Sequence, residues 1–542
     1  MPKISAYDEL SAVATGDLVP IVDVSDTSQA ATGTTKHTTI NTLSSAVAAL
    51  LSTVYIGAPG GVDDTALFTA AEASLPSSGG RIMLNAGDYA LPAGYSFSKP
   101  VILEGHGMGN PYGWNISGYT AAYPPPRLLR GITTVTVPST TASGLTFTQH
   151  GSGIQDLAII NTSSTAPSSG VGADFTAAAL CRIERCAITG FYDCVGINNG
   201  GLWAISASYI SNPVRYGIRI RNDATPDEGD GFIGNGTSIY AINRDGAAGI
   251  NWESGGGTKI SGVKINGAPG GYSFPVGIRY NCDGAAGGSS VGTVTGCSIE
   301  NVDTCIEMAR QGASGVYHLV TIIGNEFGYA TDGFKVSTAG YANTIVSGNI
   351  FVTVTNPVVI NYGSGFQIGP NIVRATSSGT TVVSVGANAG GVYVAPQQVE
   401  QTSGYTTLVA DSSSTVLADF RAKYVLGSIT ASSGALWTLV VKTDRAGTFS
   451  FSIAGTATGV GPFSFSGVRS YTRTSGTVTV ATVGTDSQIG AASTDVDLVI
   501  DTATSGHVGV GVKLKSGATA TNLRGMMDIT VNGDLSEFRQ VA

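Results

Sequence analysis

Charged side chains are scarce in this sequence: they make up 12% of its 542 residues, against 42% for hydrophobic residues. The net charge of −9 leaves no basic surface of the kind that nucleic-acid binding requires, so we expect no nucleic-acid partner. Long apolar runs are also missing, because the most apolar early stretch, 43–55, is too short and too rich in Ser and Thr to span a bilayer. We therefore expect no membrane insertion.

Cysteine and histidine are equally sparse, with six and five copies respectively. No two cysteines form a CxxC pair, and no HExxH, GxSxG or GxxxxGK[ST] motif occurs, so we expect neither a metal nor a cofactor. The cysteines fit better as buried, reduced thiols that pack as small apolar groups in a protein made in a reducing cytoplasm. They are Cys181, Cys186, Cys194, Cys282, Cys297 and Cys305.

Glycine is abundant instead, with 75 copies among many Ser, Thr, Ala and Val residues, which favours an all-β chain with many tight turns. The length exceeds that of one ordinary core. The pattern of apolar and turn residues divides the chain into three regions. They are a small N-terminal module at 1–54, a repetitive body at 55–374, and a region of longer alternating strands at 375–542. Alternation with a period of two in the last region predicts an antiparallel β-sandwich.

The body contains an internal repeat. A six-residue pattern recurs at spacings of 22 to 34 residues as IQDLAI, IERCAI, ISASYI, GNGTSI, ISGVKI, VTGCSI, IIGNEF and VSGNIF. Each unit is followed by a second apolar segment, such as VGIN, YGIR, AGIN, VGIR, TCIE and DGFK. Two strand rows that advance together predict a parallel β-helix, with coils stacked about 4.8 Å apart. The expected inward ladder is Leu157, Cys186, Val263, Cys297, Asn325 and Asn349.

Three segments near the start of the body, GAPGGVDDTALFTAAEA (57–73), GGRIMLNAGDY (79–89) and VILEGHG (101–107), resemble the first coils of the pectate-lyase-like superfamily. The sequence departs from that pattern at Gly61, where an acid or Thr is usual, and at Asn85, where Pro is common. Residues 4–43 are similar to the N-terminal anchoring segment of bacteriophage tail fibres and tailspikes.

This double resemblance implies a tailspike with a right-handed parallel β-helix. Such proteins are homotrimers that attach to the virion tail or baseplate by their N-terminus and act outside the cell on the host surface. Their body binds, and often cleaves, capsular polysaccharide or lipopolysaccharide O-antigen. The C-terminal sandwich commonly serves trimerisation or carbohydrate binding. Asp63 and Asp64 then have a structural role, in which an aspartate caps the helix that follows.

Polysaccharide hydrolysis requires two carboxyl groups that flank the glycosidic bond. Alignment of the second strand row gives one outward ladder of Asn198, Arg219, Asn251, Arg279, Glu307 and Lys335, and a next one of Gly200, Arg221, Glu253, Asn281, Ala309 and Ser337. Glu253 and Glu307 thus share a sheet face two coils apart, roughly 10 Å at the backbone. We predict that they are catalytic. The substrate-binding candidates beside them are Arg219, Arg221, Asn251 and Arg279.

Two further carboxylates are candidates for catalysis because they lie in turns near this face: Asp230, in the loop RNDATPDEGDGF, and Asp283, in NCDGAAGG. Aromatic rings stack on sugars, so Tyr209, Tyr240 and Trp203 are candidates for substrate binding. For each ring, a place in the core or in a trimer interface is the competing interpretation.

Other interpretations of the same residues stay open. Glu307 can pair with Arg279 and Lys335 in a surface charge ladder, and the Asp230 loop can be a solvated turn. A polysaccharide lyase would use a Lys, Arg, His or Tyr base beside a group that neutralises a uronic carboxylate. A receptor-binding or structural spike that does not cleave its ligand is the alternative outside enzymology.

Overall fold

The computed structural model describes nearly all of the repetitive body and most strands of the C-terminal region. The described residues are 18–23, 34–39, 52–108, 132–221, 230–242, 245–254, 256–267, 273–281, 292–309, 317–318, 320–375, 381–395, 397–401, 407–411, 417–425, 429–430, 437–442, 447–458, 461–474, 477–490, 496–501, 507–514, 519–532 and 537–541. None of them belongs to a helix long and apolar enough to cross a membrane. In the N-terminal module, β1 (Leu18–Asp23) and β2 (Thr34–Thr39) pair as an antiparallel hairpin.

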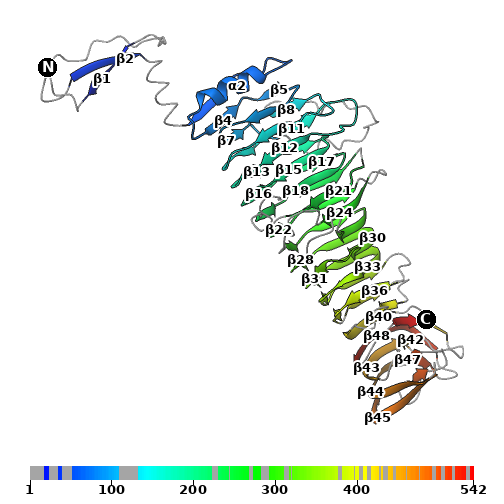
Figure 1. Ribbon diagram of the computed structural model, residues 1–542. Coiled ribbons are helices and arrows are strands. Elements are labelled where there is room, and N and C mark those ends of the chain that lie inside the picture. The colour runs from blue at the N-terminus through cyan, green and yellow to red at the C-terminus, as the bar shows by residue number, and fades with distance from the viewer. Residues whose placement is uncertain are drawn as a thin grey trace, which may run out of the picture.

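Three rows of parallel strands wind along the body, and their coils stack into the elongated array seen in Figure 1. The first row comprises β3 (Thr53–Ile56), β4 (Gly80–Leu84), β7 (Val101–Glu104), β10 (Gly153–Gln155), β13 (Arg182–Glu184), β16 (Trp203–Ser206), β19 (Gly231–Gly234), β22 (Thr258–Ser261), β25 (Gly292–Thr295), β29 (Val320–Ile323), β32 (Ile345–Ser347), β34 (Gln367–Ile368) and β37 (Tyr393–Val394). The predicted parallel β-helix is confirmed.

The second row follows a short corner after each first-row strand. It comprises β5 (Gly87–Ala90), β8 (Thr133–Val137), β11 (Ala158–Asn161), β14 (Ala187–Thr189), β17 (Tyr209–Ser211), β20 (Ser238–Ala241), β23 (Lys264–Gly267), β26 (Ser298–Glu300), β35 (Ile372–Ala375) and β38 (Gln398–Gln401). Two long strands, β30 (Glu326–Val336) and β33 (Ile350–Ser364), run from the second row into the third.

The third row carries Arg219, Asn251, Arg279 and Glu307, four of the predicted site residues, on its outward side. It comprises β6 (Tyr95–Phe97), β9 (Leu145–Phe147), β12 (Val171–Thr176), β15 (Asp193–Asn198), β18 (Tyr216–Arg221), β21 (Ala248–Trp252), β24 (Phe274–Tyr280), β27 (Val302–Met308), β36 (Thr381–Gly390) and β39 (Thr407–Asp411). At a late corner of the stack, β28 (Tyr317–His318) pairs with β31 (Tyr341–Ala342).

Inward side chains form ladders that fill the solenoid, because residues in register on successive coils stack above one another. All six members of the predicted inward ladder are buried, which confirms it. Each buried Ile or Val contributes about 1.5–3 kcal/mol relative to an exposed position. The five cysteines in the described residues are free and buried, and burial raises the pKa of Cys181 and Cys186 to about 12. Cys282 lies outside the described residues.

One register prediction was wrong. In the structure Arg219 lies opposite Gly196, whereas Asn198 lies opposite Arg221, two residues from its predicted place. Our alignment of the repeats within the chain placed Gly196 of VGIN opposite Gly217 of YGIR. In the structure the small buried residue opposite Gly217 is Cys194. A buried thiol filled the position that glycine occupies on other coils, so the glycine motif misled the alignment.

Helix α2 (Thr65–Ser74) covers the N-terminal end of the stack, and the ring of its fully buried Phe68 packs against the rings of Tyr89, Tyr95 and Phe97. Asp63 Oδ1 accepts the N–H of Thr65 at 2.9 Å, as expected of an aspartate at a helix start.

Asp64 and Glu72 fasten this helix to the first coils. Asp64, in the N-cap position, makes no side-chain bond to the helix and instead accepts the N–H groups of Gly60 at 2.6 Å and Ala90 at 2.8 Å. Glu72 is buried and accepts hydrogen bonds from the Tyr95 hydroxyl at 2.8 Å and from the Ser98 N–H at 2.6 Å. The paired aspartates at the start of the body therefore have structural roles.

Acid is expected to loosen this helix through Glu72. Burial raises the pKa of Glu72, but its hydrogen bonds from Tyr95, Ser98 and Lys99 outweigh burial and hold the pKa below the ordinary 4.5. The ionised form therefore stabilises the fold above that value, and the contribution is lost as pH falls through the lowered pKa. We expect Glu72→Gln to lose less stability between neutral pH and pH ~3 than the wild type, measured by thermal melting. Identical acid dependence in both proteins would contradict this role.

The C-terminal region consists of two antiparallel sheets that continue directly from the last coil (Figure 1). One sheet has the order β40 (Leu417–Val425), β48 (Thr519–Asn532), β43 (Gly447–Thr458), β44 (Gly461–Thr474) and β45 (Thr477–Gly490), with β41 (Ile429–Thr430) also on β48. The other has the order β39, β49 (Glu537–Val541), β42 (Trp437–Lys442), β47 (His507–Leu514) and β46 (Val496–Asp501). The predicted antiparallel sandwich is confirmed.

The boundary between body and sandwich lies later than residue 374. Strand β36 pairs in parallel with β39, and β37 with β40, so the coils continue through Asp411. Both β39 and β40 also pair in antiparallel fashion with sandwich strands. The sandwich therefore uses the last coil as part of its own sheets, which is why alternating strands begin before the solenoid ends.

Candidate active site

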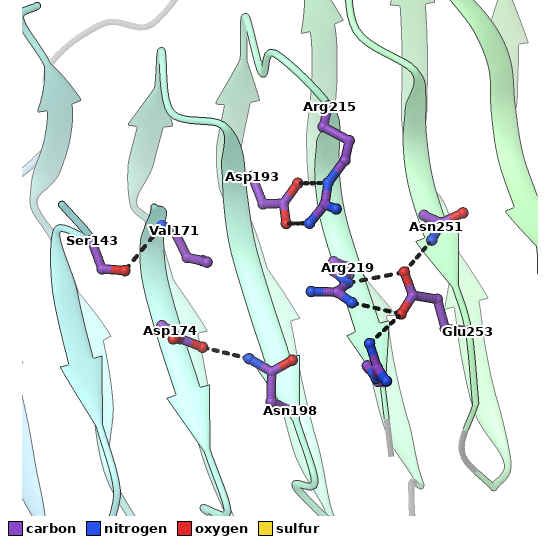
Figure 2. A network of polar contacts seen from close by, with 10 residues as sticks. Ser143, Val171, Asp174, Asp193, Asn198, Arg215, Arg219, Asn251 and Glu253 are labelled. Atoms are coloured by element: carbon purple, nitrogen blue, oxygen red, sulfur yellow. Dashed lines mark hydrogen bonds and ion pairs between the residues drawn. The ribbon is translucent and has the colours of Figure 1, made fainter. Parts of the chain in front are cut away.

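The outward side chains of the third row form a band of charged and amide groups on β12, β15, β18, β21, β24, β27 and β30, which we call the polar face. Figure 2 shows the part of it from Asp174 to Glu253. Its central ladder, in register from coil to coil, is Asp174, Gly196, Arg219, Asn251, Arg279, Glu307 and Lys335. Strand alternation places these groups outward because the residues between them are buried and apolar. Those inward residues are Ile197, Ile220, Trp252, Tyr280, Met308 and Val336.

Glu253 lies at the centre of the polar face, 5% exposed, directly after β21. Its carboxylate accepts a bidentate pair of hydrogen bonds from Arg219, from Nε to Oε1 and from Nη2 to Oε2, both at 2.9 Å (Figure 2). Asn251 Nδ2 donates to Oε1 at 2.9 Å, and Arg221 Nη1 lies 3.8 Å from Oε2. Burial lowers the pKa of Arg219, but Glu253 outweighs it and raises that pKa above its usual value. The carboxylate is thus held in one orientation.

Glu307 is fixed in a similar way two coils further along. Its Oε2 accepts from Arg279 Nε at 3.1 Å, and its Oε1 accepts from the Ser337 hydroxyl at 2.8 Å. Lys335, in register with Glu307, binds Asp332 at 2.7 Å instead. The predicted pairing of Glu307 with Arg279 therefore exists, while the predicted pairing with Lys335 is not seen. Glu253 and Glu307 lie one ladder and two coils apart, as expected.

Arg215 borders the polar face on the side of β15 and β18. Its guanidinium binds both carboxylate oxygens of the buried Asp193, with Nε to Oδ1 at 2.9 Å (Figure 2). The rings of Tyr192 and Tyr216 lie 4.6 and 4.7 Å from the same guanidinium. Two aromatic faces and a carboxylate fix this cation, so it forms a rigid wall beside the central ladder.

Asp174 was not singled out from the sequence, yet the structure places it on the central ladder (Figure 2). Its Oδ1 accepts hydrogen bonds from Asn198 Nδ2 at 2.7 Å and from the Thr176 hydroxyl at 3.3 Å. Burial raises the pKa of this carboxyl above its ordinary 3.8, against the opposing effect of those two bonds and of Arg219. The signal that would have found it was the segment VGADFT, which continues the third row one coil before VGIN.

Two amide oxygens on the polar face are buried without a hydrogen-bond partner among the described residues. They belong to Asn251, which is fully buried, and to Asn281, which is 1% exposed. Buried polar atoms are nearly always paired, and each unpaired one costs about 1–3 kcal/mol. Figure 2 shows the Asn251 amide nitrogen turned toward Glu253. Both oxygens are acceptors, so hydroxyl or N–H groups of a ligand or of water would satisfy them.

The other predicted catalytic residues do not join this cluster. Asp230 is exposed before β19, and its Oδ1 accepts the N–H of Gly257 at 2.6 Å, a bond between neighbouring coils. That contact matches the competing interpretation of a turn residue. Asp283 lies outside the described residues, so its place near the polar face stays a prediction.

Of the three aromatic candidates, Trp203 was assigned to the wrong environment. It is 2% exposed in the main core, and its indole lies so close to Gly231 that any larger residue there would collide with the ring. Tyr209 is also 2% exposed, in a small outward cluster with Ala158 and Ala187. Its ring stacks on that of the partly exposed Tyr240 at 5.4 Å between centroids. Only Tyr240 presents part of a ring to a ligand.

No family model matches the sequence, and no curated protein matches it either. Among solved structures, the tailspike of Escherichia coli bacteriophage HK620, in complex with a pentasaccharide, superposes with a TM-score of 0.50. The two share 10% identity over 94% of this chain and 97% of that one. The fold is shared with a tailspike. The tailspike of Acinetobacter baumannii bacteriophage Fri1, a capsular polysaccharide depolymerase, is similar at a TM-score of 0.42 and 11% identity, over 98% of this chain and 92% of that one.

The superposition on the HK620 tailspike shows a shared architecture, and the predicted resemblance to a tailspike is confirmed at the level of the fold. The chemistry depends on the polar face itself. There, carboxylates fixed by arginines lie beside unpaired amide acceptors and one carboxyl whose pKa is raised. Such a surface can bind a hydroxyl-rich ligand and hold carboxyl groups in a fixed orientation against it.

Proposed function

We propose that this protein is a tailspike that binds a bacterial surface polysaccharide, capsule or O-antigen, and depolymerises it by hydrolysis of glycosidic bonds. The observation that carries this proposal is the fixed, buried Glu253 at the centre of the polar face on a tailspike fold. A carboxylate locked by a bidentate arginine is already oriented before a substrate arrives. The buried amides of Asn251 and Asn281 lie beside this carboxylate on the same face and add to its polar character.

Glu253 and Glu307 are the carboxylates that we assign to the reaction. Two coils separate them at the backbone, roughly 10 Å, and their side chains can reduce this to the separation of about 6.5–9.5 Å that inverting hydrolases use. In such a site one carboxylate draws a proton from the attacking water while a protonated acid assists the leaving group.

The charge pattern favours hydrolysis over β-elimination. A lyase needs a cation free to neutralise the uronic carboxylate of its substrate. On the polar face Arg215, Arg219 and Arg279 are each already paired, with Asp193, Glu253 and Glu307. A substrate carboxylate would therefore compete with resident carboxylates for every one of these arginines.

The proposal also covers the oligomeric state of the protein and its attachment to the virion. We infer a homotrimer, because such an elongated body with apolar residues at its surface gains from side-by-side association. Exposed apolar side chains on the body include Leu180 and Leu202, which are 60% and 63% exposed. The module at 1–54 would attach the spike to the virion tail, and the sandwich would serve trimerisation or sugar binding.

The function is tested by incubating the purified protein with capsule and O-antigen from candidate hosts and by analysing the products with mass spectrometry. Hydrolysis predicts fragments that have each gained one water. Unsaturated fragments that absorb at the ultraviolet edge would instead identify a lyase. Tight binding without fragments from any bound polymer would contradict the enzymatic proposal and support a spike that only binds.

A further inference from the structure

We propose that the second strand row carries a further saccharide-binding site, separate from the polar face, which holds a neutral, hydroxyl-rich segment of the polymer. Its members are Tyr240, Asn266 and Glu300, in register on β20, β23 and β26, and the corner residues Asn301 and Tyr329. We call this set the second-row ladder. The inference rests on the proposed function only for the nature of the ligand, because it requires that a polysaccharide binds and not that it is cut.

One end of the second-row ladder is a fixed aromatic ring. Tyr240 is partly exposed, and its ring stacks on that of Tyr209, one coil earlier, at 5.4 Å between centroids. Tyr209 is itself buried, so it supports the Tyr240 ring from below. An aromatic side chain with an apolar face and a polar tip, held in this way, suits the apolar face of a sugar ring.

The middle of the ladder is a chain of hydrogen bonds between neutral donors and a carboxylate. Asn301 Nδ2 donates to Asn266 Oδ1 at 2.8 Å, and Asn266 Nδ2 donates to Glu300 Oε2 at 3.3 Å. The Ser298 hydroxyl donates to Glu300 Oε1 at 2.7 Å. A carboxylate has about four acceptor positions, so each oxygen of Glu300 can accept a further donor. Asn266 and Glu300 are partly exposed, so the hydroxyl groups of a sugar can reach them.

Charge distinguishes this site from the polar face. There, Glu253 and Glu307 are held by arginines. The hydrogen bonds of Glu300 come from uncharged side chains, and no cation among the described residues lies within salt-bridge distance of it. On the neighbouring ladder, Glu326 is exposed one coil later and Lys264 lies one coil earlier. The excess of negative charge disfavours a uronic acid and favours neutral hydroxyl donors.

The other end of the ladder is an exposed ring on a strained backbone. Gly328 lies opposite Glu300 on the next coil, and a Cβ there would lie 3.4 Å from Glu300 Cγ, so the glycine leaves that flank of the carboxylate uncovered. Tyr329 follows directly, 60% exposed and in the left-handed region at φ 51°. A bulky residue rarely adopts this conformation, and such strain concentrates at functional sites. Tyr240 and Tyr329 thus bracket the ladder three coils apart, roughly 14 Å.

The test counts binding sites in the full-length Glu253→Gln protein, which is expected not to cut. The probe is a short oligosaccharide made by partial acid hydrolysis of a polymer that the wild type binds. Titration calorimetry is expected to find two ligands per chain, and one after Tyr329→Asn and Glu300→Ala are added. Binding of the intact polymer should weaken at least about tenfold, because a long chain that engages two sites gains from their linkage.

A single variant and a control guard against loss of structure. Tyr329→Asn removes the ring and suits the backbone, since Asn301 has the same left-handed conformation (φ 57°) at the equivalent corner one coil earlier. It should melt no lower than the wild type and weaken the second site about three- to tenfold. The matched control is Tyr55→Thr, which removes a ring that is 70% exposed on β3 of the first row and should leave both sites intact.

The outcomes separate the two proposals. A wild type that binds polymer without cutting it overturns the proposed hydrolysis and leaves the second-row ladder standing, whereas one that binds no polysaccharide overturns both. Two ligands per chain after Tyr329→Asn and Glu300→Ala, or an equal loss in Tyr55→Thr, overturn the second-row ladder. A single ligand per chain before these changes does the same. If the multiple variant does not fold, Tyr329→Asn decides, and unchanged affinity at both sites counts against the proposal.

Discussion

Glu253→Gln is expected to abolish depolymerisation, with a loss of at least about 10²-fold in rate, while the protein still folds. The glutamine keeps the shape of the side chain and one acceptor for Arg219, but it cannot take a proton from water. Product release from polysaccharide, followed by reducing-end or mass analysis, measures the effect. Glu307→Gln is expected to have the same consequence.

A stability control distinguishes lost chemistry from lost structure. Removing one partner of a buried ion pair destabilises a protein, whereas replacing both by apolar groups is often neutral. The double variant Arg219→Met/Glu253→Leu should therefore melt near the wild type and remain inactive. Recovery of activity in the double variant would show that Glu253→Gln acts through stability alone. Wild-type rates in both Glu253→Gln and Glu307→Gln would refute the assignment of these carboxylates.

Asn349→Leu is expected to destabilise the body by roughly 3–5 kcal/mol. Asn349 is fully buried in a ladder of amides, where its Oδ1 accepts from both nitrogens of Asn325 at 3.0 and 2.9 Å. Its Nδ2 donates to the carbonyl of Ile322 at 3.0 Å and to Asn371 Oδ1 at 3.1 Å. Leucine has a similar volume but leaves these backbone and amide groups unpaired in the core.

Thermal melting and the half-life at elevated temperature measure this effect, the second because large assemblies often unfold irreversibly. The control is Thr321→Ala on β29, a partly exposed outward position for which we expect a change within about 1 kcal/mol. A wild-type melting temperature for Asn349→Leu would show that the amide ladder contributes little to the stability of the coils.

Much of the fold could be predicted because the solenoid repeats a local rule. The coils place a buried apolar, thiol or amide residue at the same corner and a buried apolar residue on the next strand, so Cys186, Val263 and Asn325 could be assigned to the inward ladder from their spacing. A helix over 65–73 was predictable on different grounds, since Leu67, Phe68 and Ala71 form one apolar stripe, and the structure has it at Thr65–Ser74. The resemblance of residues 57–107 to the pectate-lyase-like superfamily added the expectation of a right-handed β-helix.

The site was only partly predictable from the sequence. The register between neighbouring third-row strands depends on which residue of each strand takes the small buried position that Gly217 has on β18. Cys194 fills it on β15, and the resulting two-residue error moved Asn198 and hid the place of Asp174. The burial of individual aromatic side chains was also not predictable from the sequence. Trp203 looks like a sugar-stacking residue in the sequence, and only the packing of its ring against Gly231 on the next coil places it in the core.

The central claim is that polysaccharide is bound and cut on the polar face. A crystal structure of the Glu253→Gln variant with an oligosaccharide of the cleaved polymer tests it most directly. We predict a sugar chain seated across β18 to β27, with a glycosidic bond between the carboxyl groups of Glu253 and Glu307. An oligosaccharide bound elsewhere, with the polar face empty at saturating ligand, would contradict the account.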